Sequence, residues 1–239
     1  MTNAYRYIGD TMKYRVENKY LITNNQILCL KAKLEHCMQY DGNMHGDSYL
    51  VRSLYFDDRF DSCLYANESG TDEREKFRIR TYNNNKELIH LEQKSKLHGF
   101  TNKVSENLTK EDVECYLNAE PLRPRKEDGF LKKKLYVQMQ TKLLRPVQII
   151  EYDRTALIEP LGNVRITFDQ NICGTGEITT FFDDVIPAVP ILPEGQHILE
   201  IKYDEFLPGY IRKMVNTGEL QQISFSKYYF AREKERVMI

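Results

Sequence analysis

Residues 73–82 read EREKFRIRTY, and their side chains alternate between two kinds. Successive side chains of a β-strand point to opposite faces of the sheet. One face of this stretch carries Lys76, Arg78, Arg80 and Tyr82, and the other carries Glu75, Phe77, Ile79 and Thr81. Arginine suits a phosphate ligand because its planar guanidinium group can donate two hydrogen bonds at once. The stretch therefore predicts a strand with an apolar back and an anion-binding front.

Length and composition restrict the class of protein. The chain has 239 residues, of which 41% are hydrophobic and 29% charged, so a folded protein is expected rather than a disordered one. Its formal net charge is −1, whereas a protein that coats nucleic acid usually has more basic than acidic residues. Any anion site must therefore come from a local concentration of positive charge. We predict no nucleic-acid partner.

Cysteine usage and hydropathy bear on the compartment. The five cysteines include no CxxC pair, which favours reduced thiols in a cytoplasmic protein over a disulfide framework or a zinc site. No apolar run approaches the roughly 18 residues that a membrane-spanning helix needs. The sequence predicts a cytoplasmic chain without a transmembrane segment, and it leaves a membrane partner open.

Similar alternation recurs along the chain and predicts further strands. These strands are expected at residues 13–22, 48–57, 86–96, 147–158, 163–172 and 197–203, with a short one at 102–105 and an irregular connection with one edge strand at 173–195. Helical spacing predicts helices at 24–38, 58–67, 109–117, 127–143 and 205–215, and a last helix from Ser224 or Ser226 to about residue 235. Asn24 and Asn25 are candidate caps of the first helix, and residues 109–112 resemble a capping box.

The charged faces of these strands form a set. Its members are Arg15, Glu17, Lys19, Arg78, Arg80, Glu92, Lys94, Lys96, Arg154, Arg165, Glu200 and Lys202. For one strand, the simplest interpretation is an antiparallel sheet with one face in water. Here nearly every strand has one charged face and one apolar face. The helices between the strands also have apolar faces, which need a sheet to pack against. We therefore predict an α+β fold: a closed antiparallel β-barrel of about eight strands with a polar, basic interior and helices packed outside. An open sheet with one charged face would show the same alternation.

The balance of charge inside such a barrel points to a ligand. The set contains nine cations and three glutamates. Buried charge that lacks a partner is very costly, so the glutamates are too few for the cations. We infer that the missing negative charge belongs to a compact polyanion such as triphosphate or polyphosphate, and that the barrel is a tunnel.

Eight short motifs follow one another along the chain. They are Arg15-x-Glu17-x-Lys19-Tyr20, Ser53-Leu54-Tyr55-Phe56-Asp57, Arg78-Ile79-Arg80-Thr81-Tyr82, Glu92-x-Lys94-x-Lys96, Tyr152-Asp153-Arg154, Arg165-Ile166-Thr167-Phe168-Asp169, Leu199-Glu200-Ile201-Lys202 and Ser226-Lys227-Tyr228. In content and order they resemble the VTC-domain family of polyphosphate polymerases, within the CYTH or triphosphate tunnel metalloenzyme superfamily. The resemblance covers about the whole chain and implies a single triphosphate tunnel domain over residues 1–239.

The resemblance also implies roles for individual residues. Arg78, Arg80, Arg154, Arg165 and Lys227 would be catalytic, and Lys19, Lys94, Lys96, Lys202, Tyr152 and Ser226 would bind phosphate or nucleotide. Glu200, with Glu17 and Glu92, would hold Mn²⁺ or Mg²⁺, which usually binds through one or two carboxylates plus substrate phosphates. Ser226 and Lys227 open a helix, and a helix N-terminus is a ready phosphate site. Lys96 and Lys202 near strand ends could equally be solvated.

The implied reaction is transfer of the γ-phosphate of ATP to a growing polyphosphate chain. The acceptor already carries a charged oxygen, so no protein nucleophile is required, and catalysis rests on positioning and charge stabilisation. One alternative is a metal-dependent triphosphatase that hydrolyses tripolyphosphate or a nucleoside triphosphate, with Glu17 or Glu92 positioning the water. Another is a non-catalytic polyphosphate-binding module. RNA binding is disfavoured by the net charge and by the lack of aromatic residues interleaved in the basic strands.

Overall fold

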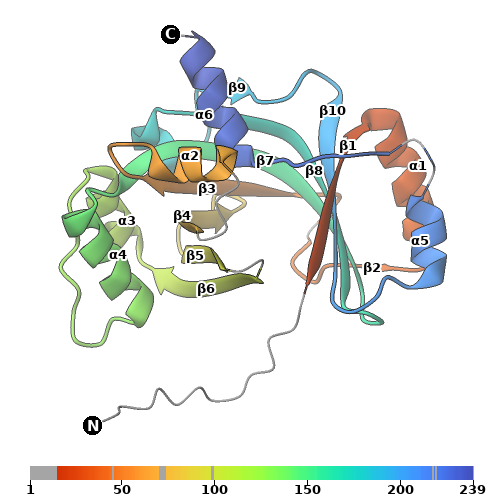
Figure 1. Cartoon of the computed structure of the whole chain (residues 1–239), viewed down its shortest axis with the longest axis horizontal. Helices are drawn as coiled ribbons and strands as arrows, with labels where there is room; N and C mark the ends of the chain where they lie inside the picture. The colour runs from red at the N-terminus through yellow and green to blue at the C-terminus, as the bar shows by residue number, and fades with distance from the viewer. Residues whose placement is uncertain are drawn as a thin grey trace.

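The computed structural model describes residues 15–44, 46–69, 74–97, 100–216, 218 and 220–238 (Figure 1). Lys13 and Tyr14 of the predicted strand at 13–22, and Glu73 of the predicted strand at 73–82, lie outside these residues.

Strands and helices alternate along the chain much as the side-chain pattern predicts. The strands are β1 (Val16–Thr23), β2 (Gln39–Tyr40), β3 (Tyr49–Asp57), β4 (Arg74–Tyr82), β5 (Ile89–Leu97), β6 (Phe100–Leu108), β7 (Arg145–Glu159), β8 (Val164–Thr175), β9 (Val189–Pro190), β10 (Gln196–Tyr203) and β11 (Gln221–Gln222). The helices are α1 (Asn24–Leu34), α2 (Ser62–Glu68), α3 (Lys110–Leu117), α4 (Phe130–Thr141), α5 (Gly209–Val215), α6 (Lys227–Met238) and the 3₁₀ helix η1 (Ile178–Phe182).

Helix starts follow local hydrogen bonding. The predicted capping box before α3 is confirmed, because the side chains of Thr109 and Asp112 each accept a hydrogen bond from the other's backbone N–H. The predicted asparagine cap of α1 is wrong. Thr23 is the residue in extended conformation, and it forms a capping box with Gln26, so both asparagines lie inside the helix. Among the described residues, no helix has the length and apolar character needed to cross a membrane.

The strands form one antiparallel sheet in the order β11-β1-β10-β8-β7-β3-β4-β5-β6, with β2 beside β7 and β9 beside β8. The prediction of a closed barrel is wrong: this order has two ends, and the sheet is curled but open. The outer edge of β1 pairs with β11 through Tyr20 and Leu21, so that part of the edge is not available to the far end of the sheet. The two sides approach through side chains, with Lys94 Nζ of β5 lying 3.5 Å from a carboxylate oxygen of Glu17 on β1.

Helices cover the convex face of the sheet, as predicted. At one end, α3 and α4 pack on the apolar side of β3, β4 and β5, with Ile79 and Leu91 of the sheet in one core with Val113 and Leu135 of the helices (Figure 1, left). At the other end, α1 and α5 pack on β8 and β10, with Phe168 in the same core as Leu30 and Ile211. Burial of the apolar face leaves the charged side chains of β1, β4, β5, β7 and β10 inside the curve.

The last helix, α6, closes one end of the concave face beside α2 (Figure 1). Asp57, at the end of β3, accepts hydrogen bonds from the backbone N–H of Cys63 at 2.8 Å and from the hydroxyl of Tyr228 at 2.5 Å. Tyr228 stacks on Tyr55 with ring centres 5.4 Å apart. Ser226, one of the two predicted caps, begins the helix by accepting from the Tyr229 N–H at 3.4 Å.

Candidate functional site

A cavity of about 850 Å³ lies in the concave face of the sheet. Among the described residues, its lining includes eleven basic side chains, namely Arg15, Lys19, Arg74, Lys76, Arg78, Arg80, Lys94, Lys96, Arg154, Lys202 and Lys227, and two carboxylates, Glu17 and Glu200. Tyr55, Tyr152 and Ser226 also line it. The electrostatic field of such a lining favours a ligand with several negative charges.

Strand register gathers these residues. Arg78 lies opposite Glu92, and Lys76 lies opposite Lys94, in the pairing of β4 with β5. In the pairing of β1 with β10, Lys19 lies opposite Glu200 and Glu17 opposite Lys202. Directly paired residues of antiparallel strands share a face. The alternation predicted from sequence therefore brings charges from distant parts of the chain onto one surface.

Arg78 and Arg80 of β4 are held by neutral and acidic neighbours. The Nε of Arg78 donates to Glu92 at 2.7 Å, and its Nη1 donates to the Tyr55 hydroxyl at 3.1 Å. Arg80 donates from Nε to Ser53 Oγ at 3.0 Å and from Nη2 to the Tyr152 hydroxyl at 3.3 Å. These bonds fix both guanidinium groups in the cavity wall before any ligand arrives, which is the arrangement that electrostatic stabilisation requires.

The carboxylate of Glu92 stabilises Arg78 and Arg80 in these positions. Burial would raise its pKa, but Arg78, Arg80 and Lys103 lower the pKa of Glu92 to about 2. One of its oxygens accepts from Arg78 and the other is in contact with Lys103, and its side chain is 3% exposed. Since its oxygens are engaged and it does not line the cavity, Glu92 does not fit the metal-ligand role that the resemblance implied.

Asp169 is an anchor that the sequence did not assign. Its carboxylate is fully buried and accepts from Arg154 Nε at 2.6 Å, from Arg154 Nη2 at 2.8 Å and from Lys227 Nζ at 2.6 Å. Lys227 also lies 4.7 Å from the ring centre of Tyr152. Arg154 of β7 pairs directly with Asp169 of β8. This contact could have been predicted from the sequence only if the register of the two strands had been known.

Glu17 and Glu200 form a carboxylate pair within a ring of lysines. Glu17 lies 3.4 Å from Lys19, 3.5 Å from Lys94 and 3.5 Å from Lys202. Glu200 lies 3.9 Å from Lys19 and 3.1 Å from Lys202. Burial would raise the pKa of Glu17, yet its hydrogen bond with Glu200 and the three lysines hold that pKa well below its usual range.

This pair suits a divalent cation that also binds substrate. Mg²⁺ commonly takes one or two carboxylates and completes its shell with water and phosphate oxygens. Within the described residues, no group of three or more His, Cys, Asp or Glu side chains is placed to hold a metal. A cation bound by Glu17 and Glu200 would therefore draw its remaining oxygens from a ligand in the cavity.

One predicted catalytic residue lies apart from the others. Arg165 donates from Nη2 to Asp41 at 2.7 Å and to the Tyr49 hydroxyl at 3.1 Å, and it does not line the cavity. It shares the concave face with Asp169, but the two residues are four positions apart on β8, which is about 13 Å along a strand. Shared face does not mean shared position along the strand.

Other lining residues had no assigned role in the sequence-based prediction. They include Arg74, Lys76, Tyr55 and Tyr228. Lys76 Nζ lies 5.4 Å from the ring centre of Tyr228. The period-two alternation with Arg78 was a sufficient signal for both Arg74 and Lys76, whereas the contribution of Tyr228 depends on where α6 packs.

The family profile of the VTC domain matches residues 14–234. No curated protein matches the chain. Among solved structures, the fold is similar to that of a proposed adenylate cyclase from Bacillus halodurans, with a TM-score of 0.54, 14% identity, and coverage of 90% of this chain and 94% of the other. The PH1819 protein of Pyrococcus horikoshii OT3 aligns with a TM-score of 0.52 and 14% identity over 94% of this chain and 99% of the other. At these identities the likeness shows the fold alone.

Proposed function

The chain belongs to the VTC-domain family, and from this premise we propose that it is an ATP-dependent polyphosphate polymerase. It would transfer the γ-phosphate of ATP to the end of a polyphosphate chain in the concave cavity. The observation that carries the proposal is the cavity lining, with eleven cations against two carboxylates. A triphosphate or polyphosphate supplies the charge that this lining lacks.

The side chains would act by positioning and charge neutralisation. Arg78 and Arg80 are placed to bind phosphate oxygens from β4, while Arg154 and Lys227 face them from β7 and α6. Phosphoryl transfer passes through a state with charge spread over the equatorial oxygens, which such a cluster stabilises. The attacking oxygen belongs to the acceptor phosphate, so the protein need only align donor and acceptor.

Glu17 and Glu200 would hold Mn²⁺ or Mg²⁺, which when bound neutralises phosphate charge as a Lewis acid. Lys19, Lys94 and Lys202 pair with these carboxylates in the free protein, and they are placed to turn to phosphate oxygens. Lys19 also donates to the carbonyl oxygen of Phe225 at 2.8 Å, which ties β1 to the segment before α6.

Two observations favour a polymerase over the triphosphatase alternative. A hydrolase would gain from a carboxylate that accepts a proton from water, and such a base works best with a pKa near the working pH. The pKa of Glu17 lies well below its usual range, and Glu92 is engaged by Arg78 and Lys103. The pKa of Glu17 is therefore too low for a general base, and the oxygens of Glu92 are already occupied.

The test is incubation of the purified protein with ATP and Mn²⁺ or Mg²⁺, followed by gel separation of polyphosphate. Arg80→Gln and Glu200→Gln are expected to lower synthesis by about a hundredfold, the usual loss when one preorganised stabilising group is removed. Arg212→Gln is the matched control, because Arg212 is an exposed arginine of α5 that donates to the Leu207 carbonyl oxygen. Free phosphate without polymer would identify a triphosphatase, and tight polyphosphate binding without turnover would identify a binding module.

The pKa of Tyr55 predicts that the affinity for a phosphate ligand depends on pH. Burial would raise its pKa, but Arg78, Arg80 and Lys227 lower the pKa of Tyr55 to about 8. The phenol is neutral below this pH and gains a negative charge above it, which opposes a phosphate ligand. We expect the dissociation constant of tripolyphosphate, measured by calorimetry, to rise between pH 7 and pH 9. Tyr55→Phe should reduce this rise, and an unchanged rise in the variant would contradict the assignment.

A further inference from the structure

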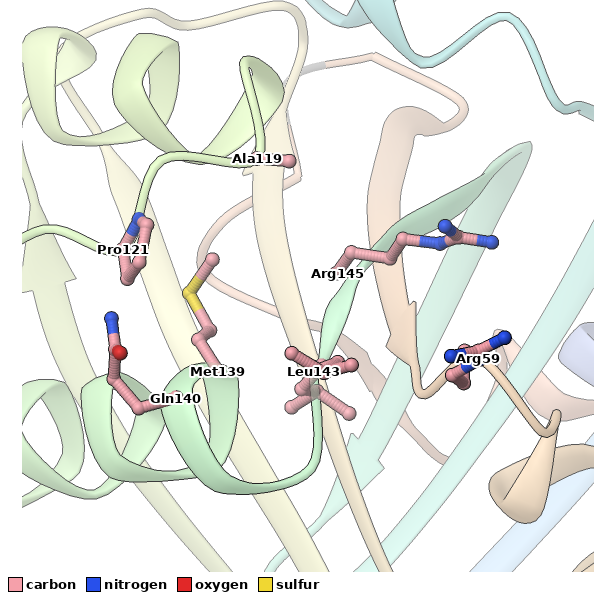
Figure 2. Close-up of a pocket in the computed structure, with 8 residues that line it drawn as sticks. Arg59, Ala119, Pro121, Met139, Gln140, Leu143 and Arg145 are labelled. Carbon is pink, nitrogen blue, oxygen red and sulfur yellow. The ribbon is translucent and has the colours of Figure 1, made fainter.

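A second cavity, of about 650 Å³, lies on the side of the sheet that α3 and α4 cover. Figure 2 shows the residues that line it. It is formed where α3 and α4 end, next to the start of β7 and the connection from β3 to α2. Met139 and Leu144, both buried, belong to the core under α3 and α4 and also line this cavity. Its volume is in the range of small-molecule sites, which are mostly apolar with a few polar groups.

The exposed side chain of Gln140 lines this cavity. The charged groups of the cavity are two exposed arginines, Arg59 and Arg145. Within the described part of the chain, neither has a carboxylate at ion-pair distance, whereas Arg52, Arg78 and Arg154 each have one. Figure 2 shows both guanidinium groups on one side of Leu143, while Met139 lies on the other side. The cavity thus has a cationic end and a second end where the apolar side chain of Met139 lies with the amide of Gln140.

Backbone strain is concentrated at the same place. Ala119 and Leu143, at φ angles of 56° and 55°, both line the cavity. The other described residues with positive φ are glycine, asparagine or aspartate, the types that tolerate this conformation. Ala119 follows α3 and Leu143 follows α4, at the helix-ending position where glycine is usual.

Retention of side chains at these two strained positions calls for a reason. A residue held in a sparsely populated conformation is more often found where a binding site requires it. Leu143 keeps an apolar side chain between the arginines and Met139, a position that glycine would leave empty (Figure 2).

We propose that this outer cavity binds a small organic anion with one acidic group, such as a phosphate, sulfonate or carboxylate, and an apolar body. Arg59 and Arg145 bind the acidic group, and Met139, Leu143 and Leu144 contact the apolar body. The site is separate from the concave cavity, because the two share no lining residue among those described. It therefore stands whether or not the chain makes polyphosphate.

The test uses anilinonaphthalene sulfonate, a fluorescent amphipathic anion, with the full chain. We expect saturable binding whose dissociation constant rises about tenfold in Arg59→Gln and in Arg145→Gln, because each loses a charge-assisted hydrogen bond. Arg212→Gln should bind as the natural protein does. Unchanged affinity in both arginine variants, or an equal loss of probe affinity in Arg80→Gln, whose side chain lines the concave cavity, would overturn the proposal.

Leu143→Gly separates binding from stability. Glycine adopts positive φ without strain, so the variant is expected to have a higher melting temperature. Its affinity for the probe should nevertheless fall, because the apolar contact is gone. A binding role for Leu143 is refuted if the variant binds the probe as tightly as the natural protein. Polyphosphate synthesis by the variant serves as a check that the concave cavity is intact.

Discussion

Asp169→Asn is expected to lower the free energy of unfolding by about 3–5 kcal/mol, the usual effect of removing one partner from a buried ion pair. The carboxylate of Asp169 is fully buried and accepts hydrogen bonds from Arg154 and Lys227. Asparagine keeps the shape but leaves two cations without a counter-charge. Both cations line the concave cavity, so polyphosphate synthesis should be lost as well. Urea unfolding followed by circular dichroism measures the first effect, and the gel assay measures the second.

Asp153→Asn is the matched control for this change. Asp153 lies on the neighbouring strand β7, is half-buried, and accepts from the Asn171 side chain at 2.8 Å rather than from a cation. Its replacement is expected to change stability by less than about 1 kcal/mol, as for most changes away from buried charge networks. Equal effects of the two substitutions would refute the anchoring role of Asp169.

The same carboxylate makes an acid-sensitive contribution to stability. Burial raises the pKa of Asp169, but Arg154 and Lys227 overcome this and lower that pKa to about 2. A lowered pKa stabilises the folded state above the unfolded value near pH 4, and the contribution is lost as pH falls through 2. The free energy of unfolding should decrease over this window in the natural protein, and less steeply in Asp169→Asn.

Arg52→Met is expected to lower the free energy of unfolding by about 3–5 kcal/mol without touching the concave cavity. The Arg52 side chain is 1% exposed and lies 2.5 Å from Glu151 on the neighbouring strand. It also donates to the carbonyl oxygens of Phe181 at 3.0 Å and Asp183 at 2.5 Å, which fastens the segment of η1 to the sheet. Methionine fills similar volume but leaves Glu151 and the carbonyl groups without their donor.

A double-mutant cycle with Glu151→Gln isolates the ion pair. If the pair accounts for the loss, the double variant Arg52→Met with Glu151→Gln should be more stable than the sum of the single effects predicts. Additive effects would show that the carbonyl bonds carry the stability instead. Arg52→Lys should recover only part of the loss, since lysine lacks the planar fork that reaches several acceptors at once.

The local sequence pattern was sufficient to predict most of the helices and strands and the charged face of the sheet. The alternation in residues 74–82 places Arg78 and Arg80 on one side of β4 and Phe77 and Ile79 on the other, and the structure confirms both. A side chain's face depends only on its parity along a strand, so this information is present in the sequence. The single domain over residues 1–239 and the cytoplasmic location stay predictions.

Contacts between segments far apart in the chain decided the features that the local pattern did not predict. Alternation is the same in a closed barrel and in a curled open sheet, because closure depends on twist and on which strand reaches the outer edge of β1. Position along a strand separated Arg165 from the cavity, although its face was correct. The sequence by itself thus determined which side chains of a strand share a face, whereas the buried partners of Arg52 and Arg154 and the strained ends of α3 and α4 were decided by the tertiary structure. Those features arise from contacts between segments far apart in the chain, which local periodicity does not encode.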